Sequence, residues 1–278
     1  MPIKIITDST SDLTEAAALE YGITVIPCYI NIGDKSYLDG IDLTHRQFYE
    51  NLPTYSFLPK TASPNQTAFE AAYQQAAAEG ATHIISIHVA GAFSSVVDTA
   101  RIAAESTGAV PVTVFDSGTV TFGMSFLAMA ASRSAMAGKS VADILNLLAD
   151  KAQRTILFAG LETVDYLRRS GRVSRVESSL ATLLRIFPVL RIYQGAVEIE
   201  RIRTHARALE RLVEMAGEMA PLEELAIMHT NCVEKAIAIR KQLEHLLPVN
   251  KIWVGEATPA IGTHVGPGGI GLVCVRAG

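Results

Sequence analysis

Short apolar runs alternate with helix-like stretches along the first half of the chain. Runs rich in isoleucine and valine at residues 3–7, 24–30, 83–88 and 111–115 predict strands. Stretches with apolar residues at helical spacing predict helices at residues 12–21, 45–51, 64–78, 95–105 and 123–137, and residues 33–42 predict a loop rich in Gly and Asp. Repeated strand, helix, strand units predict a parallel sheet with right-handed crossovers and helices on both faces.

The pattern changes after about residue 150. A helix is predicted at residues 141–153 and a strand at 155–161, followed by a hairpin within 185–203 whose turn is Gln194-Gly195. Residues 222–256 form one more strand, helix, strand unit, and a strand at 272–275 closes the chain. The fold class is therefore α/β, with a parallel-sheet, Rossmann-like domain over residues 1–155 and a smaller α+β domain over 156–278.

Composition and charge argue against several classes of protein. The 278 residues carry a formal net charge of −4, so no overall basic field attracts nucleic acid. The longest apolar stretches, such as 126–131, are far shorter than the roughly 20 residues that span a bilayer. Met1 leads directly into the first predicted strand, which is not typical of an export signal. The cysteines Cys28, Cys232 and Cys274 lack metal or CxxC spacing, so we expect reduced core thiols and a cytoplasmic protein.

Four polar loops supply hydroxyl groups and free backbone N–H groups before predicted helices. Each is typical of a helix N-cap, and Pro64 suits the first helical position. If the loops converge at the carboxyl edge of the sheet, they instead form a crevice suited to a carboxylate or a phosphate. Both interpretations stay open for the loops Thr7–Ser11, Thr61–Pro64, Gly91–Ser95 and Asp116–Thr119.

The glycine-rich segment 262–271 is the most unusual in the chain. Residues 266–271 match GxGxxG, but a strand follows them instead of a helix and no acidic residue lies about 20 positions further on, so a dinucleotide site is not supported. The glycines permit close approach of the backbone to a ligand or to the other domain, with His264 presented from a loop. The alternative is an ordinary turn before the last strand.

Catalytic signatures are missing from the sequence. It contains no GxSxG, Walker A or HExxH motif and no Cys or His cluster with metal spacing. Ser94, His264 and Asp116 include the residue types of a hydrolase triad, but nothing in their spacing supports one. The arginines at 168, 169, 172 and 175 are either a solvated face or a local site for an anion or a partner.

Five segments of the chain together carry a family resemblance: KIITDSTSDL at 4–13, TASP at 61–64, FDS at 115–117, YLRRSGRV at 166–173 and GTHVGPG at 262–268. They resemble the DegV family of bacterial fatty-acid-binding proteins. The resemblance covers almost the whole chain, in the same order as in that family.

The resemblance implies a two-domain carrier that buries one long-chain fatty acid between or beside its domains. In that family the protein presents the acid to a separate fatty acid kinase subunit, which phosphorylates the carboxylate, and no further cofactor is implied. Carried over by position, Thr61 hydrogen-bonds the carboxylate and His264 lies near the head group. Arg172, with Arg169, lies at the rim where the kinase docks.

This chain departs from the family pattern at the head-group site. The family has Ser-Gly-Thr-Tyr after the strand that ends near residue 88, whereas this chain has Ala90-Gly91-Ala92-Phe93, and Ala62 is the second residue of the Thr-Ser-x-Pro turn. Ala90 and Gly91 occupy ligand-binding positions, but Ala90 offers no hydroxyl. A buried carboxylate that lacks donors is costly and tends to protonate. Either Ser94, Ser95 or backbone N–H groups compensate, or the preferred head group differs.

Two functions are therefore weighed. The first is a fatty acid carrier, whose affinity comes from the tail: about 15 methylenes at roughly 0.8 kcal/mol each give on the order of 12 kcal/mol before the association cost. The apolar residues of 180–190 and 122–130 line the tunnel for the tail or are plain core. The second is a small-molecule phosphotransferase or hydrolase that uses the same crevice, with His264 as acid or base. The lack of nucleophile, metal and nucleotide motifs favours the carrier.

Overall fold

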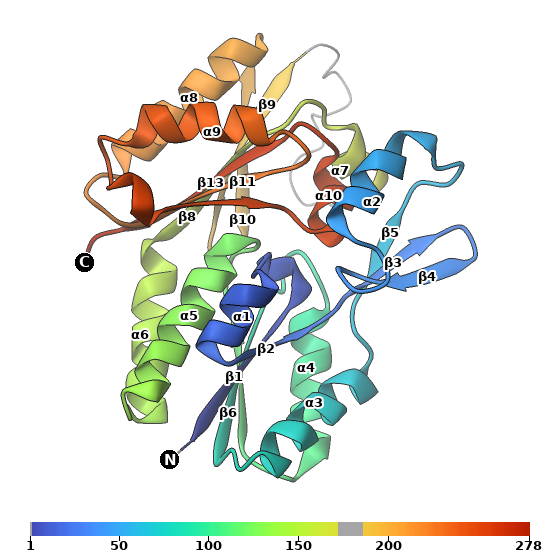
Figure 1. Cartoon of the computed structure of the whole chain (residues 1–278), viewed down its shortest axis with the longest axis vertical. Helices are drawn as coiled ribbons and strands as arrows, with labels where there is room; N and C mark the ends of the chain where they lie inside the picture. Colours follow the sequence, from blue (N-terminus) through green and yellow to red (C-terminus); the bar gives the residue numbers. More distant parts are fainter. Residues whose placement is uncertain (1, 172–185) are drawn as a thin grey trace.

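A computed structural model describes residues 2–171 and 186–278 of the chain (Figure 1). The strands are β1 Ile3–Asp8, β2 Ile23–Ile26, β3 Tyr29–Ile32, β4 Lys35–Leu38, β5 Lys60–Ala62, β6 His83–His88, β7 Val112–Asp116, β8 Thr155–Gly160, β9 Phe187–Tyr193, β10 Ala196–Ile202, β11 Leu222–His229, β12 Ile252–Glu256 and β13 Ile270–Arg276. The helices are α1 Glu15–Tyr21, α2 His45–Asn51, α3 Gln66–Ala78, α4 Val96–Thr107, α5 Phe122–Met136, α6 Val141–Arg154, α7 Asp165–Arg169, α8 His205–Glu218, α9 Val233–Leu243 and α10 Pro259–Val265.

The first half forms the predicted parallel sheet. Its strand order is β2-β1-β6-β7, and every neighbouring pair is parallel. Alternate residues face opposite sides: Ile5 and Ile85 pack with α5, while Ile6 and Ile84 pack with α3 and α4. Because both faces are covered, the strands are apolar runs without polar alternation, which is why they are recognisable in the sequence.

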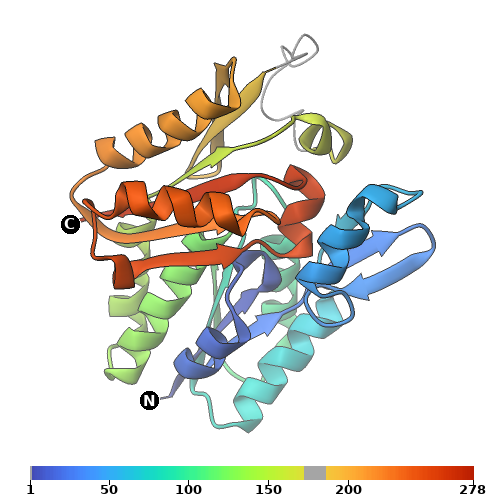
Figure 2. The same cartoon turned by 45° about the horizontal axis from the view of Figure 1, so that its top comes forward.

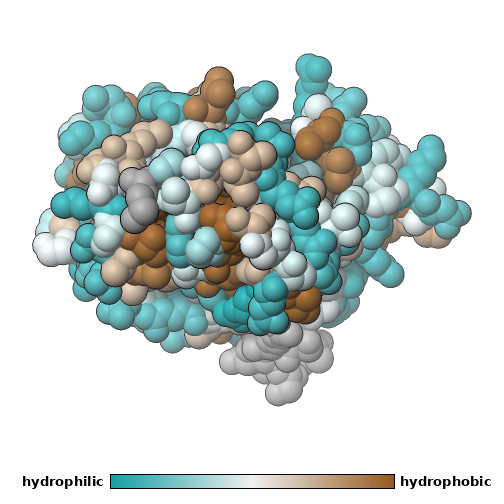
Figure 3. All heavy atoms as spheres, turned by 90° about the horizontal axis from the view of Figure 1, so that it is seen from below, coloured by the Kyte–Doolittle hydropathy of each residue, from teal (hydrophilic) through white to brown (hydrophobic). Residues whose placement is uncertain are grey.

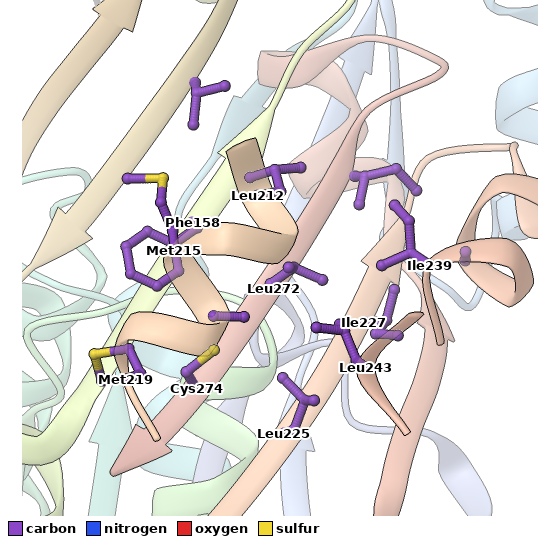
Figure 4. Packing of buried hydrophobic residues seen from close by; sticks show 14 of the residues in the cluster. Phe158, Leu212, Met215, Met219, Leu225, Ile227, Ile239, Leu243, Leu272 and Cys274 are labelled. Carbon is purple, nitrogen blue, oxygen red and sulfur yellow. The ribbon is translucent and has the colours of Figure 1, made fainter. Parts of the chain in front are cut away.

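The second half forms a six-stranded mixed sheet of order β10-β9-β8-β13-β11-β12. Helices α8 and α9 cover one face, where Leu212, Ile239 and Leu272 belong to one buried cluster (Figure 4). The other face packs on α5 and α6, and α5 also contacts β1 and β6 of the parallel sheet, so α5 lies between the two sheets. The fold class is thus confirmed, while the exact boundary at residue 155 stays a prediction.

The hairpin predicted around Gln194-Gly195 is present between β9 and β10. Both turn residues have positive φ, 49° for Gln194 and 74° for Gly195, as a tight two-residue hairpin turn requires. Its tip reaches the first domain, because the Gly195 N–H donates to the Gly118 carbonyl at 2.7 Å.

The single strand predicted at residues 24–30 is wrong. The chain breaks at Pro27-Cys28 into β2, which joins the parallel sheet, and β3, which leaves it. Proline has no N–H to donate to a ladder, so the strand ends there. β3 pairs antiparallel with β4, inside the predicted 33–42 loop, and with β5, and this three-stranded sheet was not predicted. Helix α8 was not predicted either.

His264 lies in a helix, so its predicted loop location is wrong. α10 begins with Pro259 at its first position and ends before Gly266, whose φ is 72°. A Cβ on Gly262 would lie 2.5 Å from the Tyr49 hydroxyl and 2.8 Å from Phe48 Cε1. The glycine therefore permits a close approach of the backbone, and the two elements that approach are α10 and α2 (Figure 2).

The surface mixes apolar and polar groups. The face in Figure 3 shows apolar residues as separate patches among polar ones. Within residues 2–171 and 186–278, no helix combines the length and apolar character needed to cross a membrane.

Candidate functional site

A cavity of about 440 Å³ lies between the loops of the first domain and the six-stranded sheet. One wall is apolar and comes from strands of the second domain, whose side chains on this face also pack on the first domain. The lining residues on these strands include Leu157 and Ala159 of β8, Leu190 and Ile192 of β9, and Val197 and Ile199 of β10. Such a wall, at a domain interface, is typical of a small-molecule site.

The opposite side of the cavity is polar. Ser63, Ser94 and Ser95 line it from the loops before α3 and α4, and Thr10 and Thr121 line it from the loops after β1 and β7. Three of the four predicted polar loops follow strands of the parallel sheet, as expected. The fourth, with Thr61, comes from the three-stranded sheet and reaches the cavity from the side. No residue of the predicted loop Asp116–Thr119 lines the cavity.

Thr61 and His264 meet at this lining although they are 203 positions apart in sequence. Thr61 Oγ1 lies 2.9 Å from His264 Nε2, and both side chains are partly buried. Thr61 pairs with Ile30 in the β3–β5 ladder, which orients its side chain. The structure thus brings together the two residues that the resemblance named for the head group, and their role in ligand binding stays a prediction.

Buried groups of the first domain hold the segment that leads into α10. Asp12 Oδ1 accepts the Thr258 N–H at 2.8 Å, and Asp39 Oδ1 accepts the Ala260 N–H at 3.3 Å. Burial raises the pKa of the Asp12 carboxyl to about 7 and that of Asp39 to about 6, against hydrogen bonds that lower both. These contacts fix the position of the helix that carries His264.

A buried polar chain lies behind the loop after β1. His88 Nδ1 lies 2.9 Å from Asp8 Oδ2, Ser86 Oγ lies 2.7 Å from His88 Nε2, and the Tyr73 hydroxyl lies 3.0 Å from Ser86 Oγ. The Asp8 and His88 side chains are fully buried. This chain is closed to solvent, and its contact with the cavity runs through Thr10, whose hydroxyl donates to Asp8.

Other predicted residues divide between the cavity and the body of the protein. Ser94 lines the cavity, and its Oγ accepts the Val96 N–H at 3.4 Å. Ala90 and Gly91 do not line it: Ala90 is buried, and the Gly91 N–H donates to Asp116 at 3.1 Å. Their ligand-binding role stays a prediction.

The structure describes only some of the arginines that were predicted to form a local site. Arg169 is exposed at the end of α7, whereas α7 itself contributes Leu167 to the cavity lining. Arg172 and Arg175 lie outside the described residues. The rim role of Arg169 and Arg172 therefore stays a prediction.

The structure does not assemble a hydrolase triad from Ser94, His264 and Asp116. Asp116 directs its carboxylate oxygens at the N–H groups of Gly91 and Gly118, at 3.1 and 2.9 Å. In the described part of the chain, no three His, Cys, Asp or Glu side chains are grouped to hold a metal ion.

The two interpretations of the apolar segments 122–130 and 180–190, tunnel lining or plain core, apply to different residues. Residues 122–130 belong to α5 and are core between the sheets; none of them lines the cavity. Leu190 does line it, and residues 180–185 lie outside the described residues. Sequence reasoning missed the wall of β8, β9 and β10, because alternation shows that a strand has an apolar face but not what that face meets. It also missed Thr121 and Cys28 as lining residues, whereas Thr10 belongs to the predicted loop Thr7–Ser11.

Fold and site together define a two-domain α/β protein with an apolar cavity between the domains and hydroxyl groups along one side of it. Comparison with known proteins identifies the family. The family model described as "Uncharacterised protein, DegV family" matches residues 2–277, and the chain belongs to this family.

Relatives and solved structures agree with that assignment. DegV domain-containing proteins of Streptomyces coelicolor and Deinococcus radiodurans are 32% and 33% identical, each covering 98% of this chain, with 97% and 98% of their own lengths matched. A fatty-acid-binding DegV family protein of Thermus thermophilus superposes with a TM-score of 0.91 at 27% identity, covering 100% of both chains. DegV of Bacillus subtilis, described as a fatty acid binding protein, has a TM-score of 0.91 at 26% identity. The match covers 99% of this chain and 100% of that protein.

Proposed function

We propose that this protein binds one long-chain fatty acid in the cavity, with its carboxylate at Thr61 and His264 and its tail along β8, β9 and β10. The observation that carries the proposal is the Thr61–His264 contact on the polar side of a cavity whose opposite wall is apolar. Structures described as fatty-acid-binding DegV proteins support the ligand class. The tail supplies affinity by apolar burial, and the hydroxyl groups supply orientation.

The head-group site contains hydroxyl groups even though Ala90 and Ala62 depart from the family pattern. Ser63 Oγ and Ser95 Oγ lie 2.9 Å apart across the loops before α3 and α4, and both residues line the cavity. Ser94 is next to this pair, and the Val96 N–H bond uses only its oxygen, so its hydrogen stays available. These serines replace the hydroxyl that Ala90 cannot offer, which is one of the two compensations considered from the sequence.

The proposal extends to presentation of the acid. The bound acid is offered to a fatty acid kinase that docks at the α7 end of the cavity, near the exposed Arg169. The three cysteines are free and buried, which suits a reducing cytoplasm. A carrier of this kind does not itself transfer phosphate, so the protein incubated alone with ATP and oleate yields no acyl phosphate. Acyl phosphate formed without a partner would overturn the carrier assignment in favour of a phosphotransferase.

Mass spectrometry of the purified protein tests the ligand. Native spectra show a mass increase near one equivalent, and denatured extracts contain a fatty acid whose length and saturation give the preferred tail. A protein that is purified empty and takes up no added fatty acid contradicts the proposal.

A further inference from the structure

Strand β10 is both an edge of the six-stranded sheet and a wall of the cavity. Val197 and Ile199 line the cavity from this strand. Among the described strands, β10 pairs only with β9, so no ladder holds its outer side. Backbone pairing therefore constrains the position of this wall from one side only.

A second cavity lies behind the same wall. Its volume is about 700 Å³, and residues of α8 bound it on the side away from the strands. Successive residues of a strand point to opposite faces, and Val197 accordingly lines the first cavity while Glu198 and Glu200 line the second. Ile199 lines both. Because β10 stands between two cavities, a small displacement of this strand meets less resistance than it would in a close-packed core.

The two ends of β10 are held differently. At the far end, Ile202 is buried in the core of the second domain, which fixes that end. Along the strand, Glu200 accepts from Arg211 of α8 at 2.9 Å, and Glu198 accepts from Arg191 of β9 at 3.0 Å. The side chains of these two ion pairs are 21% to 69% exposed, and such pairs stabilise by about 1 kcal/mol or less. The position of the other end therefore depends on the tip of the hairpin.

The hairpin tip rests on two loops of the first domain. The Gly195 N–H donates to the Gly118 carbonyl at 2.7 Å. A Cβ on Gly118 would lie 3.2 Å from Gln194 Cα, and a Cβ on Gly195 would lie 3.2 Å from Ala92 Cβ. Both distances are shorter than ordinary van der Waals contact, so an added methyl group has to push the tip away. The two glycines therefore let the tip stand as close to the first domain as the backbone permits.

The position of the tip is transmitted to the cavity along the strand. Val197 is two residues from Gly195, which is about 7 Å along an extended strand. The register between β10 and β9 is continuous from Ala196 to Ile202. A displacement of the tip away from the first domain therefore carries Val197 with it and widens the cavity.

We infer that the docking of the hairpin tip sets the width of the tail site, so that Gly118 and Gly195 act as positioning residues for the tail. The inference rests on the proposed function. With both glycines present, the wall stands close to the first domain, and the site selects straight acyl chains over chains that carry side branches. A substitution that displaces the tip relaxes this selection.

Two acids with main chains of equal length test the width of the site. Palmitic acid is straight, whereas phytanic acid carries methyl branches. Displacement of a fluorescent fatty acid gives Kd for each, and the quantity compared is Kd of phytanic acid divided by Kd of palmitic acid. Gly118→Ala and Gly195→Ala are each expected to lower this ratio about fivefold, as expected when the overpacking of one methyl group is relieved. A general loss of stability would weaken both acids alike and leave the ratio unchanged.

Matched glycines separate the tip contact from backbone strain. The φ of Gly22 is 59° against 62° for Gly118, and Gly138 has the same φ of 74° as Gly195. A Cβ on Gly22 or on Gly138 would meet nothing within 4 Å. Gly22→Ala and Gly138→Ala therefore carry the strain of an alanine with positive φ without touching the hairpin, and their ratios are expected to equal that of the unaltered protein.

Hydrogen exchange tests the same wall without a substitution. The Gly195 amide is expected to exchange faster in the complex with phytanic acid than in the complex with palmitic acid. The reason is that the wider tail pushes β10 outward and weakens the bond to the Gly118 carbonyl. Amide NMR of the two saturated complexes measures both rates, and equal rates would contradict the inference.

The outcomes separate the inference from the proposed function. If palmitic acid binds the unaltered protein and the ratio stays the same in Gly118→Ala and Gly195→Ala, the inference is overturned and the proposed function stands. An equal fall of the ratio in the Gly22 and Gly138 controls also overturns the inference, because backbone strain would then be the cause. Failure of both acids to bind the unaltered protein overturns the proposed function itself.

Discussion

Asp12, just after β1, accepts a hydrogen bond of 2.8 Å from the backbone N–H of Thr258, which lies 246 positions later in the chain. Asp12 is 4% exposed, and its other carboxylate oxygen accepts from the Thr121 hydroxyl. One buried carboxyl group therefore joins the first strand of the molecule to the segment that positions α10 and His264. This contact makes the geometry of the cavity depend on the docking of the two domains.

Asp12 is expected to make the stability of the protein fall as pH rises. Burial raises its folded-state pKa to about 7 from an ordinary value of 3.8, so the folded protein binds more protons than the unfolded chain between about pH 4 and about pH 7. The free energy of unfolding then decreases with pH in that window, on the order of a few kcal/mol from this group. Asp12→Asn keeps an oxygen for the Thr258 N–H and removes the titration.

Urea denaturation at a series of pH values measures this effect. Subtracting the Asp12→Asn profile from that of the unaltered protein removes the contributions of other groups, including His45 and His229, whose pKa values burial lowers. The difference is expected to change across the pH 4 to 7 window. If the free energy of unfolding changed with pH in the same way for both proteins, Asp12 would have the same pKa in the folded and unfolded states, which would contradict this prediction.

Thr61→Val is expected to weaken fatty acid binding more than Ser94→Ala does. Valine keeps the shape of threonine but removes the hydroxyl that contacts His264, and loss of a hydrogen bond to a charged group costs about 1.5–3 kcal/mol, or roughly tenfold or more in Kd. Ser94 shares its role with Ser63 and Ser95 at the lining, so its loss costs less. Displacement of a fluorescent fatty acid measures both variants, and equal losses would mean that the head group lies elsewhere.

Gly262→Ala is expected to destabilise the protein by about 1–3 kcal/mol, because the added methyl group meets the Tyr49 hydroxyl and Phe48 of α2. Gly217 is the matched control: it lies inside α8, and a Cβ added there would meet nothing within 4 Å, so Gly217→Ala is expected to stabilise by up to about 1 kcal/mol. Thermal melts compare the two. Equal melting temperatures for both variants would contradict this packing argument. Gly262→Ala is also expected to move α10 and so to weaken fatty acid binding.

Ala159→Leu is expected to shift the preferred ligand to shorter chains. Ala159 lines the apolar wall from β8, and the larger side chain occupies space that the tail would fill. Each methylene that loses its place costs about 0.8 kcal/mol, so affinity for the longest acids falls most. Ala137→Leu, at an exposed position after α5, is the control. Competition among saturated acids of increasing length tests this, and an unchanged order of preference would place the tail elsewhere.

The sequence predicted most of the elements because burial leaves a local pattern. β6 and α2 have the predicted bounds, and the hairpin at Gln194-Gly195 follows from turn residues that tolerate positive φ. The break at Pro27 was visible in the sequence, yet the apolar run on both sides of it favoured one continuous strand. α10 was missed because its glycines, which serve contact with α2 and the turn at Gly266, are typical of loops.

The sequence by itself determined the α/β class, the strand and helix alternation and the family, since these depend on local periodicity and on motifs read in order. Tertiary structure decided which residues meet at the cavity: Thr61 with His264, Asp12 with Thr258, and the apolar strands of the second domain with the hydroxyl groups of the first. The physical reason is that such contacts join segments up to 246 positions apart, and their distances depend on how the two sheets pack on α5. Local periodicity records that a side chain is buried, and only packing determines what it is buried against.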